Sequence, residues 1–379
     1  MVQIFRAVLT VVSLMLLISC GPKQVSVNSS SNVKKIIAYI FPSNDTIDTS
    51  KIDIGRLTHI NYSFAKINNG CIETGYLSDS INLRLLREHI DKNNPKAALI
   101  ISVGGWEFSD QFSDMALSGT SRKKFIESAL KFIQYFKLDG IDVDWEYPGR
   151  PGKTNNFRAE DKTTFNLLLD ELRQALDSIG IIDNKHYITS VAIPAFHEFY
   201  ATTEVTEFSK HLDFINLMTY DFYGEWEPVS GHQSNLYDAK SPKYLSADSA
   251  VRFLLQKNIP ADKIVLGIPF YSRSWKITGQ SNNENIHNLG QGAGINSVYE
   301  DLLSEYININ GYNQHWDSSA CVPYLWNENL DIFVTYENPE SVKIKCEYIK
   351  DNKLGGAMFW KYNLQKENLL LNVIYNELN

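Results

Sequence analysis

The 379-residue chain is poor in cysteine and has no pattern of metal ligands. Apart from Cys20, near its start, it has only Cys71, Cys321 and Cys346, and none of these forms a C-x-x-C pair. Three cysteines cannot all pair, so a fully disulfide-bonded framework is excluded, although a bridge between Cys321 and Cys346 stays open. The eight histidines are scattered and no H-E-x-x-H occurs. We therefore expect neither a metal ion nor a cofactor.

Clusters of positive charge and phosphate-binding glycine motifs are also missing. The net charge is −8, and no part of the chain contains a run of lysine or arginine that could bind a phosphate backbone. Both features argue against a nucleic-acid partner. No G-x-G-x-x-G follows the first predicted strand, which argues against a dinucleotide fold. The hydrophobic content of 44% is enough for one large domain or two ordinary ones. General disorder is thereby excluded.

The apolar run at residues 7–18 is too short to cross a bilayer, which takes about 20 residues. Arg6 precedes the run, and it closes on L-I-S-C, which resembles the lipobox of bacterial lipoproteins. An ordinary secretory peptide with an incidental cysteine is the alternative. We predict a signal peptide at residues 1–20 with lipidation at Cys20 and a Ser/Asn-rich tether at 21–33. The protein would then be anchored by lipid in the cell envelope, in the outer membrane and facing the periplasm or the surface.

Short apolar runs rich in β-branched residues alternate with helical patterns along the rest of the chain. Apolar residues recur with a period of 3.6 at 122–136 and 165–179, which predicts helices there. Alternation of strand and helix implies a parallel sheet. Eight such units fit an α/β fold of the (β/α)8 TIM-barrel type better than an open doubly wound sheet. The predicted strands are 36–40, 59–64, 98–103, 140–146, 187–193, 214–220, 263–270 and 355–360.

One connection, between the seventh strand and a predicted helix at 341–350, is too long for a plain loop. Strand patterns at 322–328 and 331–337 and a helical pattern at 298–306 indicate that it has its own structure. We predict a small α+β subdomain at 274–339, inserted at the catalytic rim between strands seven and eight. The barrel would then consist of residues 34–273 and 340–379.

The stretch D-G-I-D-V-D-W-E-Y-P-G, at 139–149, crowds four carboxylates into the fourth predicted strand. Because side chains alternate along a strand, Asp142, Asp144 and Glu146 would share the face that points into the barrel, with Glu146 at the carboxyl end. Same-face neighbours lie about 6–7 Å apart, so at least one carboxyl group should hold a proton near neutral pH. Such an acid suits protonation of a glycosidic oxygen.

Two other interpretations of this stretch use a cation. Asp-x-Asp-x-Glu could bind Mg²⁺, but Trp145 and Tyr147 make a bulky setting for a hydrated ion. An EF-hand loop needs glycine at its sixth position, where Tyr147 stands when the count begins at Asp142. The EF-hand is excluded.

The same stretch resembles the D-x-x-D-x-D-x-E signature of glycoside hydrolase family 18, the chitinase family, and the resemblance covers nearly the whole chain after the tether. The stretches S-V-G-G-W at 102–106, M-T-Y-D at 218–221 and P-F-Y-S-R-S-W at 269–275 are similar to further motifs of the family, as is Trp360. The insertion resembles the chitinase insertion domain. The resemblance implies a retaining hydrolase of β-1,4 linkages between N-acetylglucosamine units, in which the 2-acetamido group of the substrate supplies the nucleophile.

The resemblance also assigns catalytic roles. Glu146 would be the acid/base, and Asp144 would hold the acetamido N–H. Asp142 would pass charge or a proton within the trio, and Tyr220 would donate to the acetamide oxygen. Asp139 would be structural support at the start of the strand.

Further residues are expected to bind substrate. Trp360 would form the floor under the sugar at the cleavage site, Trp106 would stack at an adjacent subsite, and Asp221 would contact the distorted sugar. Core packing is an equal alternative for Tyr39 and Phe64. The remaining expected substrate-binding residues are Met218, Tyr271, Arg273, Ser102, Trp226, Gly105 and Tyr147.

The sequence departs from the family pattern at two places outside the acidic trio. Ser272 replaces a usual glycine, and Lys361-Tyr362 follow Trp360 where small or acidic residues are more common. These changes leave activity intact but bear on subsite preference.

Two alternative functions stay open. One is an endo-β-N-acetylglucosaminidase that cuts the chitobiose core of N-glycans. Trp106 and the predicted insertion argue for the chitinase instead, because a wall formed by the insertion suits a linear polymer. The other is a non-catalytic chitin-binding lectin, against which the intact Glu146 argues. The expected partner is an oligo- or polysaccharide of N-acetylglucosamine, met by a monomeric protein.

Overall fold

The computed structural model describes residues 33–237, 245–278 and 286–379. The predicted signal peptide, the lipidation of Cys20 and all of the predicted tether except Val33 lie outside these residues. None of the helices in these ranges combines the length and the apolar character that a membrane-spanning helix needs.

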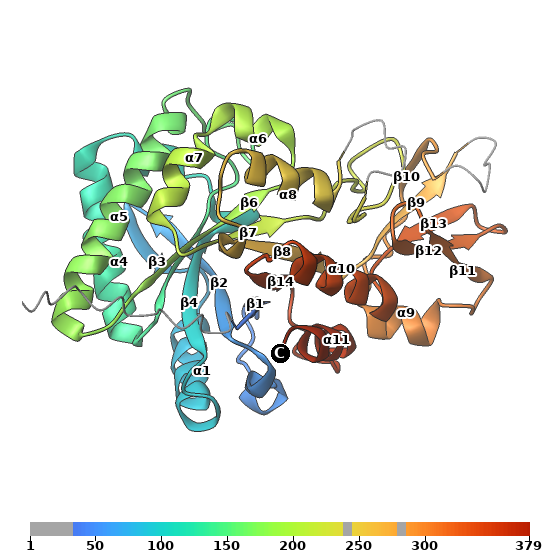
Figure 1. Cartoon of the computed structure of the whole chain (residues 1–379), viewed down its shortest axis with the longest axis horizontal. Coiled ribbons are helices and arrows are strands. Elements are labelled where there is room, and N and C mark those ends of the chain that lie inside the picture. The colour runs from blue at the N-terminus through green and yellow to red at the C-terminus, as the bar shows by residue number, and fades with distance from the viewer. Residues whose placement is uncertain (1–32, 238–244, 279–285) are drawn as a thin grey trace, which may run out of the picture. The chain divides into compact units, whose positions relative to one another are not determined.

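Eight parallel strands close into a barrel, in the order β1, β14, β8, β7, β6, β5, β4, β2 and back to β1 (Figure 1). The predicted (β/α)8 fold is confirmed, and each of the eight predicted strands is present with ends that differ by a few residues. The short strand β3 (Cys71–Thr74) extends β2 as an antiparallel hairpin that we did not predict. The barrel strands are β1 (Lys35–Ile40), β2 (His59–Asn68), β4 (Ala98–Gly104), β5 (Gly140–Asp144), β6 (Ile188–Pro194), β7 (Phe214–Met218), β8 (Ile264–Pro269) and β14 (Gly356–Trp360).

Helices cover the outside of the barrel, and their starts carry recognisable caps. Helix α4 begins after Ser118, which exchanges hydrogen bonds with Ser121 in a capping box, and α10 begins after Asn338 with a proline in its first turn. The helices are α1 (Asp79–Asn93), α2 (Gly105–Phe108), α3 (Phe112–Ala116), α4 (Gly119–Phe136), α5 (Asp161–Asp183), α6 (His197–Thr202), α7 (Val205–Phe208), α8 (Ala247–Gln256), α10 (Pro339–Asp351) and α11 (Leu369–Leu378). Short 3₁₀ turns lie at Thr49–Lys51, Ile54–Arg56, Ser209–His211 and Ala261–Lys263.

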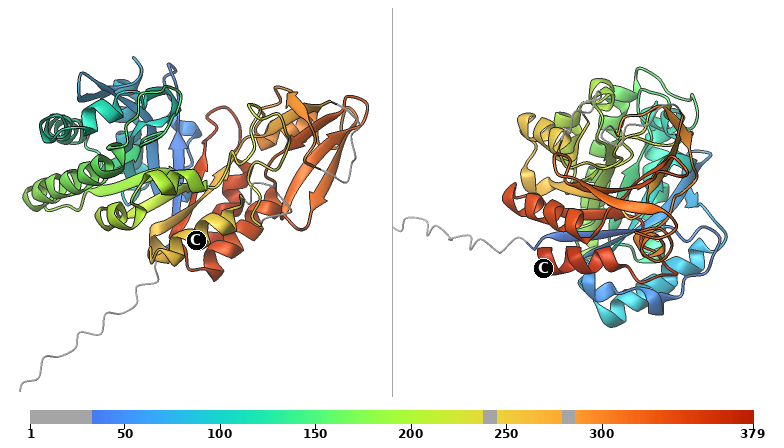
Figure 2. Two further views of the ribbon diagram at one scale, coloured as in Figure 1. Left: turned by 90° about the horizontal axis from the view of Figure 1, so that it is seen from above. Right: turned by 90° about the vertical axis from the view of Figure 1, so that its right-hand side faces the viewer.

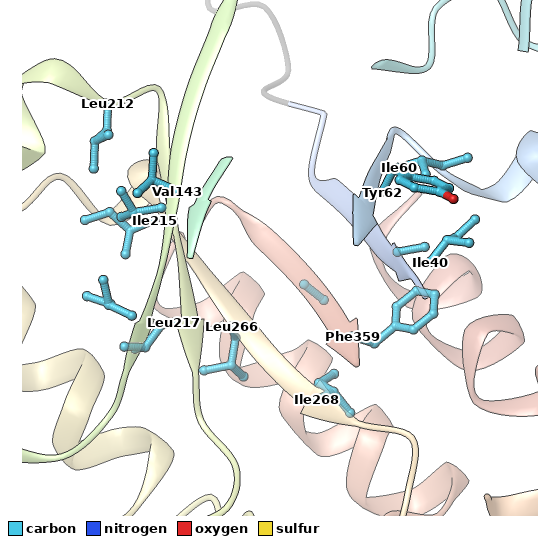
Figure 3. Packing of buried hydrophobic residues seen from close by; sticks show 14 of the residues in the cluster. Ile40, Ile60, Tyr62, Val143, Leu212, Ile215, Leu217, Leu266, Ile268 and Phe359 are labelled. Atoms are coloured by element: carbon cyan, nitrogen blue, oxygen red, sulfur yellow. The ribbon is translucent and has the colours of Figure 1, made fainter. Parts of the chain in front are cut away.

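The strand residues divide into two separate apolar clusters because side chains alternate across the barrel wall. In β1, Ile36, Ala38 and Ile40 belong to the large outer cluster under the helices, whereas Ile37 and Tyr39 belong to the inner one. Figure 3 shows outer-cluster side chains from several strands. The inner cluster fills the barrel, so the lumen is a packed core and not a pore. It consists of Ile37, Tyr39, Ile100, Phe214, Val265 and Met358.

The long connection after β8 forms a five-stranded antiparallel sheet, in the order β10, β9, β13, β12, β11 (Figure 1). Figure 2 shows the strands of this sheet in orange from two further sides. Strands and a helix lie at the three places predicted for the insertion, while β9, β10 and β11 were not predicted. Its limits at residues 274 and 339 remain predictions. Its elements are β9 (Arg273–Ile277), β10 (Gly290–Gly292), α9 (Tyr299–Glu305), β11 (Tyr312–Asp317), β12 (Val322–Asn327) and β13 (Ile332–Thr335).

A buried ion pair joins this sheet to the barrel. Lys345 of α10 and Glu337, just after β13, are both inaccessible to solvent and lie in contact. The Lys345 ammonium also donates to the Ser234 carbonyl oxygen (2.6 Å), in the loop after β7, and Ser341 donates to Glu337 (2.6 Å). A buried pair holds its geometry only when such extra hydrogen bonds satisfy it. The loop after β7 and the chain from Glu337 into α10, which are distant in sequence, therefore meet at one point.

Candidate active site

The acidic stretch lies at the carboxyl end of β5, as predicted, but the strand ends earlier than predicted. β5 stops at Asp144, two residues before Glu146, which therefore lies on the loop above the strand. Trp145 is almost fully buried, with its ring stacked on Phe112 (5.2 Å) and edge-on to Phe165 (5.6 Å). Because this ring is fixed under the helices, it holds the direction in which Glu146 leaves the strand.

Asp142 lies at the centre of a buried hydrogen-bond network. Its Oδ2 accepts from the hydroxyls of Tyr39 (2.9 Å) and Ser102 (2.7 Å), and its Oδ1 accepts from Ser190 Oγ (2.6 Å) and Asn216 Nδ2 (3.2 Å). Burial raises the pKa of Asp142, and the four donated hydrogen bonds oppose that rise. The site therefore holds a carboxylate that is desolvated yet well satisfied.

Two residues that we expected to contact substrate belong to this network instead. Ser102 is inaccessible and Tyr39 nearly so, and both hydroxyls are used on Asp142. They lie beneath the site because they stand on strand faces that point into the closed barrel. Sequence reasoning missed Ser190 and Asn216, although each is a polar residue inside an apolar strand. Ser102, Asp142 and Ser190 are direct neighbours in the strand register. A search for polar residues at matching positions of neighbouring strands could therefore have found Ser190.

Asp144 is the least satisfied member of the trio. Its side chain is buried, and no group among the described residues hydrogen-bonds its Oδ1. Burial, then the negative charges of Glu146 and Asp142, raise the pKa of Asp144 well above its usual value. Ser109 holds the backbone here, since its hydroxyl donates to the Asp144 carbonyl oxygen (3.1 Å) and accepts from the Glu146 N–H (2.9 Å).

Glu146 has a pKa suited to exchange of a proton near neutrality. Burial raises its pKa to about 7, a hydrogen bond with Tyr147 opposes the rise, and the negative charge of Asp221 adds to it. Tyr147 itself packs edge-on against Phe196 (5.3 Å), with the Arg150 guanidinium over the Phe196 ring at 4.3 Å. The group can therefore act as acid and as base in one reaction cycle.

A second group of predicted residues surrounds Asp221, which follows β7. Arg273 binds both Asp221 oxygens at 3.0 Å. The guanidinium also lies over the rings of Tyr271 (4.9 Å) and Trp226 (5.1 Å). Tyr220 meets Tyr271 edge-on at 6.3 Å, and burial followed by the charge of the nearby carboxylates raises its pKa well above the usual value. The Tyr220 hydroxyl thus stays protonated and available as a donor.

Aromatic rings gather around Trp360, the residue expected to lie under the sugar, and we call this group the aromatic floor. Trp360 stacks on Phe64 at 5.5 Å and lies 5.8 Å from Tyr39 and 6.0 Å from Phe41. Phe64 is therefore part of the floor and not of the outer core. Phe41 was missed because an isolated aromatic after a strand gives no signal of its own.

Trp106 stands apart from this floor and is 48% exposed, in the short helix α2 that follows β4. The backbone before it is unusual, because Gly104 and Gly105 both have positive φ, of 107° and 67°. A Cβ on Gly105 would come within 2.6 Å of the Phe64 ring. Gly105 therefore allows the floor and the Trp106 loop to approach each other closely.

Two predicted residues lie outside the polar centre. Asp139 is at the opposite, amino-terminal end of β5, where it accepts from the Leu99 N–H (2.7 Å) and pairs with Arg87 (2.9 Å) and Lys185 (2.6 Å). Met218 is partly buried against the inner apolar cluster.

The described residues contain no group of three or more His, Cys, Asp or Glu that could hold a metal ion. Cys71, Cys321 and Cys346 are all free, so the bridge that the sequence left open between Cys321 and Cys346 is not formed.

Comparison with known proteins identifies this arrangement. The sequence profile of the family described as glycosyl hydrolases family 18 matches residues 35–364. The chain belongs to this family. The resemblance drawn from the acidic stretch is thereby confirmed.

Individual relatives agree with the family. The chain is 37% identical over 304 residues to Chitinase A1 of Niallia circulans, a match that covers 76% of this chain but only 44% of that relative. It is 33% identical over 323 residues to Chitotriosidase-1 of Mus musculus, with 83% and 68% of the two chains covered. Among solved structures, a family 18 N-acetylglucosaminidase from Paenibacillus barengoltzii superimposes with a TM-score of 0.83 and 34% identity, over 91% of this chain and 100% of that one.

Proposed function

We propose that this family 18 member hydrolyses β-1,4 linkages between N-acetylglucosamine units of chitin or chito-oligosaccharides, with retention of configuration. The observation that carries the proposal is the pairing of two carboxyl groups above an aromatic floor. Glu146 has a pKa of about 7, and beside it Asp144 has an oxygen with no partner among the described residues. The similarity to enzymes named as chitinases and as an N-acetylglucosaminidase supports the substrate class.

The proposed chemistry uses the substrate as its own nucleophile. Glu146 donates its proton to the glycosidic oxygen as the bond to the anomeric carbon breaks. The free Asp144 Oδ1 accepts the acetamido N–H, and the Tyr220 hydroxyl donates to the acetamide oxygen. That oxygen attacks the anomeric carbon and closes a five-membered ring. Glu146, now a base, takes a proton from the water that opens the ring, so the configuration is retained.

Asp142 and Asp144 share one proton in this proposal, and their different environments determine which of them carries it. Asp142 has four donors to stabilise its negative charge, whereas Asp144 faces two like charges. We therefore place this proton on Asp144 in the free enzyme. When the acetamido N–H arrives, a stronger acceptor is needed at Asp144, and Asp142 is in position to share the charge.

The surrounding residues would position the sugars. Trp360 supplies a flat apolar floor, and the exposed Trp106 supplies a second stacking surface at a neighbouring subsite. Arg273 holds Asp221 in place for a contact with the distorted sugar.

Attachment to the cell envelope through a lipidated Cys20 is part of the proposal. The Ser/Asn-rich segment leads into β1 at its amino end, and the active-site residues lie at the carboxyl ends of the strands. We propose a monomer.

The proposal is tested by incubating the protein with chitin oligosaccharides and, separately, with a high-mannose glycopeptide. We expect cleavage of the oligosaccharides alone, and its loss in Glu146→Gln, with binding retained. Cleavage of the glycopeptide alone would identify the endo-β-N-acetylglucosaminidase. Binding of oligosaccharides without cleavage by the wild type would identify the lectin.

A further inference from the structure

Lys361 directly follows the floor residue Trp360 and has no role in the chemistry proposed above. Its ammonium lies over the Phe41 ring, 4.7 Å from the centroid. That ring belongs to the floor, because it is 6.0 Å from the rings of both Trp360 and Phe64 and 5.8 Å from that of Tyr76. The cation therefore stands at the edge of the surface on which we propose that sugars stack.

This cation lacks a counter-charge. Among the described residues, no carboxylate lies within ion-pairing distance of the Lys361 ammonium, whereas other cations of the rim are paired. Arg273 is bound to Asp221, and Lys153 to Glu107. Burial lowers the pKa of Lys361, and no acidic neighbour offsets that effect. The side chain is exposed and its ammonium rests on the Phe41 ring, so it is accessible to an incoming anion, which would supply the missing counter-charge.

The rest of the site offers little to an anion. The Asp142 carboxylate lies beneath it, the charge of Arg273 is already paired with Asp221, and the whole chain has a net charge of −8. A negatively charged sugar is therefore favoured only where a local cation is available. Lys361 supplies such a cation at the edge of the floor, next to Trp360 in the chain.

We propose that Lys361 binds an anionic substituent, a carboxylate or a sulfate ester, on the N-acetylhexosamine unit next to the one over Trp360. Chains with such a substituent are then preferred over neutral ones. This inference rests on the proposed function, because it names the substrate class of the same site.

The test compares three tetrasaccharides of N-acetylglucosamine as substrates. One is unmodified, one carries a 6-O-sulfate, and one carries a carboxylate as a 3-O-lactyl ether. For the wild type we expect kcat/KM to be about fivefold higher for at least one anionic substrate, the size of effect that one partly exposed ion pair gives. We expect the difference between anionic and neutral substrates to lie in KM and to become smaller as the salt concentration is raised.

Variants separate charge from packing. Lys361→Gln loses the preference and leaves kcat/KM on the neutral substrate within about twofold, and Lys361→Arg keeps the preference. Lys153→Gln is the matched control, since it removes a positive charge that Glu107 already pairs on the same rim. A preference for only one anionic substrate identifies which substituent the site takes.

The inference is overturned if the wild type does not distinguish the three substrates. It is also overturned if Lys361→Gln weakens all three equally, because Lys361 then bonds a neutral sugar. If the wild type cleaves none of them, the proposed function fails instead, and calorimetric binding of the three sugars to Glu146→Gln decides the inference separately.

Discussion

At the scale of single residues, three carboxyl groups of one short stretch differ because their surroundings differ. Asp142 receives four hydrogen bonds, the Oδ1 atom of Asp144 receives none from the described residues, and Glu146 lies above the strand end beside Tyr147. The sequence predicts that the three cannot all be ionised together. It cannot predict which of them is protonated, because the donors come from four other strands.

The pH dependence of activity follows from Glu146. Its pKa is raised from the usual value of 4.5 to about 7, so the group stays protonated, and able to donate, up to about pH 7. We expect kcat/KM on a chitin oligosaccharide to fall tenfold per pH unit above that value. A profile measured on Glu146→Gln, at its residual rate, should lack this limb. A wild-type profile that stays flat to pH 9 would contradict the assignment.

The network around Asp142 makes a second prediction. Asn216→Leu removes one donor without changing the size of the side chain much, so the pKa of Asp142 rises. We expect the acidic limb of the kcat/KM profile to move to higher pH and kcat to fall about tenfold, with folding retained. Asn216→Asp is the contrasting variant, since a further carboxylate beside Asp142 should lower activity more. An unchanged acidic limb in Asn216→Leu would show that Asp142 does not titrate in the cycle.

At the scale of elements, the sequence predicts the barrel strands well because each is a short buried run between helical patterns. The end of β5 was predicted two residues too late, since Asp-x-Asp-x-Glu continues the alternation beyond the last hydrogen-bonded residue. Strands β10 and β11 escaped prediction because β10 has only three residues and β11 has three exposed polar residues in a row. Their pairing depends on partners that are distant in sequence.

The junction between the inserted sheet and the barrel should depend on Lys345. Lys345→Met leaves Glu337 buried without its cation, which costs about 3–5 kcal/mol in free energy of unfolding. Chemical denaturation measures this loss. Adding Glu337→Gln should recover part of it, and Lys350→Met, which removes a lysine from a partly exposed pair with Glu377, should change stability little. Equal effects of Lys345→Met and Lys350→Met would refute the role of the buried pair.

At the scale of the whole molecule, the chain order could be predicted but the contacts across the barrel could not. The eight strand–helix units, the insertion and the acidic stretch are local patterns. Tyr39, Ser102 and Asn216 come from three different strands, and only closure of the barrel brings their side chains to Asp142. For this reason the sequence could not predict that the hydroxyls of Tyr39 and Ser102, which we expected at the substrate or, for Tyr39, equally in the core, donate to Asp142.

The proposed anchor is a property of the full chain. We expect the full-length protein, expressed in a bacterial host, to sediment with membranes and to incorporate labelled fatty acid, because Cys20 would become lipidated. Cys20→Ala should abolish the incorporation of label. The variant should also leave the membrane fraction, from which the wild type is released only by detergent. Incorporation of label into Cys20→Ala would place the lipid elsewhere, and the absence of label in the wild type would leave an ordinary secretory peptide.

The most direct test of the substrate-assisted mechanism follows the anomeric configuration of the first product by NMR, with N-acetylated and de-N-acetylated oligosaccharides as parallel substrates. The account predicts that the N-acetylated substrate releases the β-anomer first and that the de-N-acetylated one is not cleaved, because Asp144 and Tyr220 act only through the acetamido group. Release of the α-anomer, or cleavage of both substrates at equal rates, would contradict it.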